Sequence, residues 1–138
     1  MLRSLQRAMM SHGVYLAACG YSYHGPAGRL GFAPKISPDN FAAAFTVAAG
    51  WGSYRQTRRT HQQVSSIDLR YGTLTLRSFS TELPKSCRSV EVSLLRHGSH
   101  LRVVDGRLST DGDQVVVTFD RAVELVAGDE LSLVYVTS

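Results

Sequence analysis

Residues 67–77 have the sequence IDLRYGTLTLR, and this stretch decides the fold class. Large apolar side chains occupy every second position before Tyr71-Gly72 and again after it. A period of two is the pattern of a β-strand that buries one of its faces. Because glycine accepts a positive φ in a tight turn, Tyr71-Gly72 predicts a hairpin that joins two strands.

The same alternation continues on both sides of this stretch. Further runs of probable strand cover residues 29–32, 44–48, 52–58, 89–94, 101–103, 115–119 and 131–135. Asp and Gly turn signals separate the later runs at about every 8 to 12 residues, which is typical of an antiparallel sandwich. The pattern predicts a mainly β fold, an immunoglobulin-like or jelly-roll-like antiparallel β-sandwich.

The N-terminal segment has a different period. Leu2, Leu5, Met9 and Leu16 fall close to one 3.6-residue stripe, and Gly20 is placed to end a helix. We therefore expect one α-helix before the sandwich. The expected divisions are a helix at 1–20, a Gly/Pro-rich connection with the first strands at 21–62, and the sandwich core at 63–138, all folded together as one domain.

Composition limits the class of protein. The chain has 138 residues, 43% of them hydrophobic and 19% charged, which is ordinary for one globular domain. A net charge of +4 permits anionic partners without indicating nucleic acid. The two cysteines, Cys19 and Cys87, are too few for a disulfide framework, and we expect free thiols. No secretion signal and no apolar run of about 20 residues is present, so we expect no membrane span and a cytoplasmic location by default.

The sequence contains no motif that is typical of a catalytic or metal-binding site. The chain has no Gly-x-Ser-x-Gly motif, and its carboxylates fall on turns or on polar strand faces, where solubility explains them. His97 and His100 lie three residues apart, but no third ligand is close in sequence. The sequence predicts no catalytic residue, no metal site and no cofactor.

One segment mixes aromatic and basic residues. Residues 51–59, WGSYRQTRR, contain Trp51 and Tyr54 among four arginine and glutamine side chains. These rings are candidates for stacking on sugars or bases. The structural interpretation, which we favour, makes Trp51 a buried anchor and places the arginines on the solvent side of an edge strand.

Residues 6–56 resemble the C-terminal end of glycoside hydrolase family 116, which includes the non-lysosomal glucosylceramidases and bacterial β-glucosidases. The most specific motifs are GYSYHGPAG at 20–28, GFAP at 31–34 and AGWG at 49–52. The resemblance implies that the N-terminal helix is the last one of an (α/α)6 catalytic barrel. It also implies that the catalytic carboxylates lie upstream of this region, so no position here matches them.

One substrate-binding residue carries over from the resemblance. The family has a His-Tyr-x-Arg motif on this helix, and its arginine helps to hold the sugar. Arg7 matches that arginine, although Ser4 and Leu5 stand where the family has His and Tyr.

Three functions follow from these observations. The first is a non-catalytic accessory or truncated β domain of a family 116-like glycosidase, with a structural or subunit-contact role. Its partner would be a catalytic glycosidase chain or a second copy, through the helix. The second is a free-standing carbohydrate-binding module, which requires at least two exposed, nearly coplanar rings from Tyr21, Tyr23, Trp51 and Tyr54. The third is a basic nucleic-acid-binding domain, with Arg55, Arg58 and Arg59 clustered near Arg70 or Arg77. A complete glycosidase is the least favoured function.

Overall fold

The computed structural model describes residues 20–35 and 37–137, and within these ranges the regular structure consists of strands. Most of them are long enough to cross a small domain. They are β1 (Ser22–His24), β2 (Arg29–Phe32), β3 (Asn40–Val47), β4 (Gly50–Arg59), β5 (Gln62–Glu82), β6 (Cys87–Arg96), β7 (Ser99–Val104), β8 (Gly106–Asp111), β9 (Gln114–Val126) and β10 (Asp129–Thr137).

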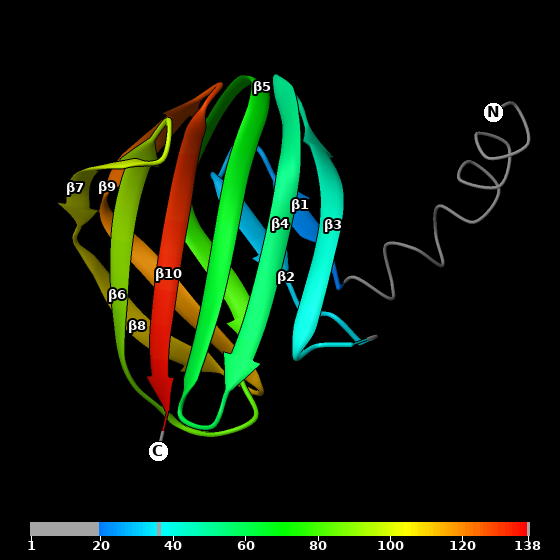
Figure 1. The fold of residues 1–138 in the computed structure, drawn as a ribbon, viewed down its shortest axis with the longest axis vertical. Coiled ribbons are helices and arrows are strands. Elements are labelled where there is room, and N and C mark those ends of the chain that lie inside the picture. Colours follow the sequence, from blue (N-terminus) through cyan, green and yellow to red (C-terminus); the bar gives the residue numbers. More distant parts are fainter. Residues whose placement is uncertain (1–19, 36, 138) are drawn as a thin grey trace, which may run out of the picture.

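The strands form one continuous hydrogen-bonded network that folds into two layers (Figure 1). The first layer has the order β3-β4-β5-β10-β6-β7, and the second has the order β1-β2-β5-β9-β8. Strand β5 belongs to both: its first half pairs with β4 and β10, and its second half pairs with β2 and β9. The long strand therefore joins the layers at one end of the fold.

Strand β5 also overturns the predicted hairpin. The chain passes through Tyr71 and Gly72 without reversing, although Gly72 does have a positive φ of 81°. The amide of Thr73 donates to the carbonyl of Ala49 at 3.1 Å, so the bend is fixed by the neighbouring β3–β4 turn. The buried residues are odd-numbered before the bend, even-numbered at Leu74 and Leu76 directly after it, and odd-numbered again after the irregularity between Leu76 and Ser78. The glycine bends the strand from one layer into the other instead of ending it.

The predicted fold class needs correction. The mainly β prediction is confirmed, but the strands form one continuous network, and β2 pairs with β5 in parallel rather than antiparallel. The prediction of a preceding α-helix is not supported: the described residues contain no helix, and residues 2–19 lie outside them. Cys87 carries a free thiol, whereas Cys19 also lies outside the described residues.

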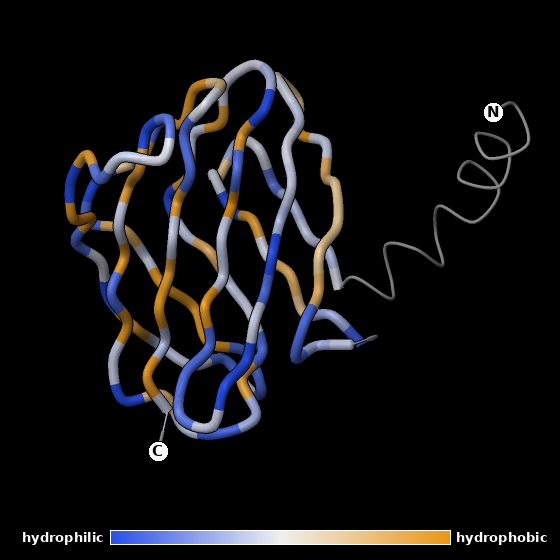
Figure 2. The backbone as a smooth tube through the Cα atoms, in the orientation of Figure 1, coloured by the Kyte–Doolittle hydropathy of each residue, from blue (hydrophilic) through white to orange (hydrophobic). Residues whose placement is uncertain are grey.

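The core lies between the layers and is rich in aromatic rings. Phe32 of β2 stacks on Tyr54 of β4, with ring centroids 4.1 Å apart and planes 2° from parallel. Phe45 and Phe79 complete the cluster at 5.9 and 5.8 Å from these two rings. Hydrophobic and hydrophilic residues alternate along the strands (Figure 2), as expected for a two-layer fold with one buried side per layer. No helix in the described ranges could span a membrane.

Candidate functional site

Two aromatic side chains lie exposed beside each other on the outer side of the first layer. Trp51 of β4 is 46% exposed, and its register partner Tyr71 of β5 is 65% exposed. Directly opposed side chains on antiparallel strands are close enough to act on one ligand. We call Trp51 and Tyr71 the aromatic pair.

Close backbone packing holds the aromatic pair in place. Gly50 opposes Gly72, and a side chain on either glycine would collide with the carbonyl oxygen of Tyr71 or of Ala49. A register shift between Trp51 and Gly52 adds a bulge at the same point. The backbones of β4 and β5 therefore pack closely beside the aromatic pair.

A hollow of about 380 Å³ is lined by residues close in sequence to the aromatic pair. Its lining includes Ala49, two residues before Trp51, and Thr73, two residues after Tyr71, but neither ring of the pair. Its side chains are mostly small or apolar: Tyr23, Gly25, Pro26, Ala48, Ala49, Thr73, Leu74 and Thr75.

The structure separates the two predicted ring residues. Trp51 is exposed, so its interpretation as a buried anchor is wrong; β4 also lies between β3 and β5 and is no edge strand. Tyr54 is fully buried, and its hydroxyl bonds to Gln56 at 2.7 Å and to Ser65 at 3.0 Å. Burial raises the pKa of Tyr54 to about 12. Its ring has no face open to a sugar.

The other candidate residues are two half-buried tyrosines and Arg7. Tyr21 and Tyr23 are half-buried against the core, and the Tyr21 hydroxyl donates to the carbonyl of Thr46 at 2.6 Å. Burial raises the pKa of Tyr21 to about 12. Arg7 lies outside the described residues. Tyr71 was not predicted as a site residue. A signal was present, because Gly50-Trp51-Gly52 and Tyr71-Gly72 both place a large ring next to glycine in a strand.

A buried polar network occupies the core beside Tyr54. Five side chains that are at most 1% exposed share hydrogen bonds between 2.7 and 3.4 Å: Tyr54, Gln56, Gln63, Ser65 and Thr81. The Tyr135 hydroxyl is also buried and has no hydrogen-bond partner. The network is closed from solvent, so we assign it to core specificity rather than to ligand binding.

Two of the arginines expected in a basic cluster have partners within the fold. Arg58 bonds to Gln63 at 2.8 Å and to the carbonyl of Glu82 at 3.0 Å, so it closes the end of the core. Arg70 lies 3.6 Å from Asp68. Arg55 and Arg59 are exposed, so internal contacts occupy part of the expected nucleic-acid-binding cluster.

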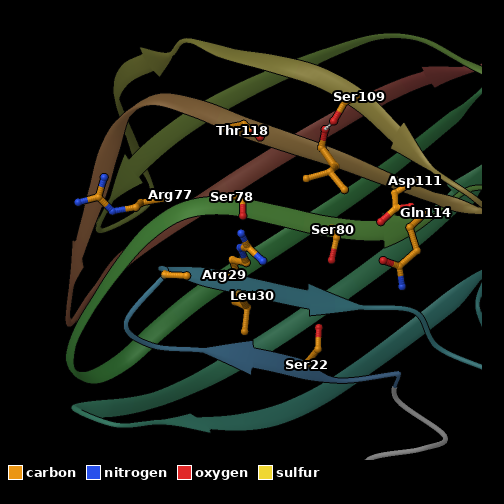
Figure 3. A pocket seen from close by; sticks show the side chains of 12 residues that line it. Ser22, Arg29, Leu30, Arg77, Ser78, Ser80, Ser109, Asp111, Gln114 and Thr118 are labelled. Carbon is orange, nitrogen blue, oxygen red and sulfur yellow. Dashed lines mark hydrogen bonds between the residues drawn. The ribbon is translucent and has the colours of Figure 1, made fainter.

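A polar cleft of about 610 Å³ lies on the outer side of the second layer (Figure 3). Figure 3 shows Arg29 beside Ser78 in one part of the cleft and Asp111 with Gln114 at the other end. Its lining residues are Ser22, Ala27, Arg29, Leu30, Arg77, Ser78, Ser80, Ser109, Asp111, Gln114, Val116 and Thr118. Asp111 is the single carboxylate among them, whereas glycoside hydrolysis generally requires two.

Metal binding finds no support in the described ranges. Among residues 20–35 and 37–137, no three His, Cys, Asp or Glu side chains come together as a metal site would require. His97 and His100 lie around the exposed β6–β7 turn, where His97 and Gly98 have positive φ values of 51° and 81°.

Comparison with known proteins assigns this chain to no family. No protein-family model and no curated protein matches the chain, so membership of glycoside hydrolase family 116 is not shown. One similar solved structure is α-L-rhamnosidase from Dictyoglumus thermophilum, at 11% identity and a TM-score of 0.42, over 86% of this chain and 12% of that chain. Another is the carboxy-terminal domain of the turkey type 3 siadenovirus fibre, avirulent form, complexed with 3-sialyllactose. That match has 10% identity and a TM-score of 0.28, over 72% of this chain and 99% of that chain.

Proposed function

We propose that this chain is a non-catalytic carbohydrate-binding β domain that holds a neutral sugar against the aromatic pair. The observation that carries the proposal is the exposure of Trp51 and Tyr71 as register partners on neighbouring strands. The C–H face of a pyranose ring is apolar, and an exposed indole beside a phenol offers it a matching surface.

The absence of chemistry at this surface fits a binding role. The aromatic pair and the nearby hollow include no carboxylate or histidine, the side chains that most often act as general acids and bases. We therefore propose that the domain has no catalytic activity of its own. Its role as an accessory domain of a family 116-like glycosidase is a finer proposal, which rests on the resemblance of residues 6–56 alone.

Calorimetric titration with cellotriose tests the binding role. The wild-type chain is compared with Trp51→Ala, Tyr71→Ala and the control Leu101→Ala, which truncates an exposed apolar residue on β7, at 48% exposure. An aromatic contact contributes about 0.5–1.5 kcal/mol beyond burial of area, so each ring variant should bind up to about tenfold more weakly.

A control variant and a check of folding accompany the titrations. Leu101→Ala should bind as the wild type does, and all variants should keep the same far-UV circular dichroism. If the folded wild-type chain takes up no cellotriose or longer β-glucan, or if both ring variants bind unchanged, the aromatic pair is not a sugar site.

A further inference from the structure

The polar cleft has a floor of small side chains that runs across five strands. In register, Ser22 of β1 opposes Gly31 of β2, Gly31 aligns with Ser80 of β5, and Ser80 opposes Val116 of β9, which opposes Ser109 of β8. Four strand spacings of about 4.8 Å give a length of about 19 Å. An extended oligomer can therefore lie across the strands.

The absence of a side chain at Gly31 leaves the middle of the cleft open. A side chain at this position would collide with the hydroxyls of Ser80 and Ser22 on its two sides. Glycine is buried here between two serines, so any larger residue would fill the middle of the cleft.

The two long borders of the cleft differ in charge. One neighbouring register row contains His24, Arg29, Ser78, Thr118 and Arg107. The opposite row contains Glu82, Gln114 and Asp111, and Lys35 already pairs with Glu82 at 3.0 Å. Arg77 adds a second guanidinium to the lining at the irregularity between Leu76 and Ser78.

Several polar side chains of the cleft have no partner among the described residues. In the described ranges, the side chains of Arg29, Arg77 and Asp111 make no ion pair and no hydrogen bond, and neither do those of Ser80 and Gln114. Guanidinium groups bind carboxylates through paired, charge-assisted hydrogen bonds. Carboxylate, amide and hydroxyl groups bind the hydroxyls of a polyol.

We infer that this cleft is a second binding site, which takes an acidic oligosaccharide laid across β1, β2, β5, β9 and β8. A uronic-acid carboxylate lies against Arg29, and the hydroxyls of the neighbouring sugar lie against Asp111 and Gln114. The site is independent of the aromatic pair, because it lies on the other layer and uses different chemistry.

A nucleic acid is the other anionic polymer that arginines bind. Single strands are held largely by stacking of bases on aromatic side chains, and the cleft has no aromatic residue in its lining. This lining favours a sugar chain with carboxylates and many hydroxyls over a single-stranded nucleic acid.

Titration of the full chain with trigalacturonate, cellotriose and an oligothymidylate of similar length tests the inference. Arg29→Ala removes the guanidinium, and Thr118→Glu places a negative charge on the same row at an exposed position. Both should weaken trigalacturonate binding at least tenfold and leave cellotriose binding unchanged. The matched control Arg88→Ala, an exposed arginine on β6, should change neither.

The outcomes separate the two sites. Wild-type binding of trigalacturonate that falls with salt and with both cleft variants, but not with Trp51→Ala, supports the acidic-sugar site. Absence of trigalacturonate binding, equal binding of oligothymidylate, or loss with Trp51→Ala alone overturns it. Cellotriose binding tests the aromatic pair, whereas trigalacturonate binding tests the cleft. The failure of one proposal can therefore be distinguished from the failure of the other.

Discussion

Replacing Asp129 should destabilise the fold by an amount that its contacts allow us to estimate. Asp129 is fully buried at the start of β10. Its carboxylate accepts two hydrogen bonds from Arg96, at 2.8 and 3.1 Å, and one from the amide of Val126, at 3.0 Å. The carboxylate therefore fixes the β9–β10 turn to the end of β6.

The magnitude follows from the kind of hydrogen bond. Bonds to charged groups contribute about 1.5–3 kcal/mol to stability. Because the Arg96 side chain is 46% exposed, solvent screens part of the interaction, and Asp129→Ala should cost about 1.5 kcal/mol. Arg96→Ala should cost more than Asp129→Asn, because it leaves a buried carboxylate without its cation.

The same pair sets a pH dependence. The Arg96 guanidinium holds the pKa of Asp129 below its usual range, against the opposing effect of burial. A depressed pKa in the folded state stabilises the fold above the unfolded pKa of about 3.9, and this stabilisation is lost as the pH falls through the folded value. The stability difference between wild type and Asp129→Asn should therefore be full at pH 7 and shrink below about pH 4.

Urea unfolding followed by circular dichroism measures these differences at pH 7 and at several acidic values. The m-values should be equal, so that changes in midpoint report stability. A cost below about 0.5 kcal/mol for Asp129→Ala at pH 7 would refute the estimate. If the difference in unfolding free energy between the wild type and Asp129→Asn stays constant as the pH falls, the role of the charge is refuted.

Two further predictions concern the core and the bend. Tyr54→Phe should destabilise the chain by about 1–3 kcal/mol, because Gln56 and Ser65 would remain buried without this hydroxyl; unchanged urea stability, or altered cellotriose binding, would contradict this. Gly72→Ala should cost more than Gly112→Ala: both glycines have positive φ, but only at Gly72 would the new methyl group collide with backbone, whereas Gly112 has open space. Equal losses of thermal stability would show that the close approach at the bend is unimportant.

The candidate site could be only half predicted from the sequence. Trp51 and Tyr54 lie three residues apart in one alternating strand, and nothing in the composition says which ring faces solvent. Positions three apart on a regular strand face opposite sides, and in the structure Trp51 is exposed whereas Tyr54 is buried. Tyr71 was missed because its apolar character in an alternating run suggested the core. Arg70 has no register partner on β4, and this irregularity shifts the phase of β5 so that Tyr71 is exposed.

The cleft could not be predicted from the sequence. Its floor is made by single residues from five strands, and strands far apart in the chain become neighbours there. Arg29 and Asp111 are 82 positions apart by number, and only the shared partner strands bring them to one surface. No local pattern marks such a site, because each contribution is one or two polar residues on an ordinary strand face.

The sequence by itself determined that this protein is built of strands, since a period of two decides which side chains can be buried together. It also located most of the strands. Only the tertiary structure decided that the two halves of β5 form one strand. A glycine with positive φ serves a hairpin and a bend equally well, and the choice depends on the backbone of Ala49 packing against it. That choice sets the two layers, and with them the exposed aromatic pair and the cleft.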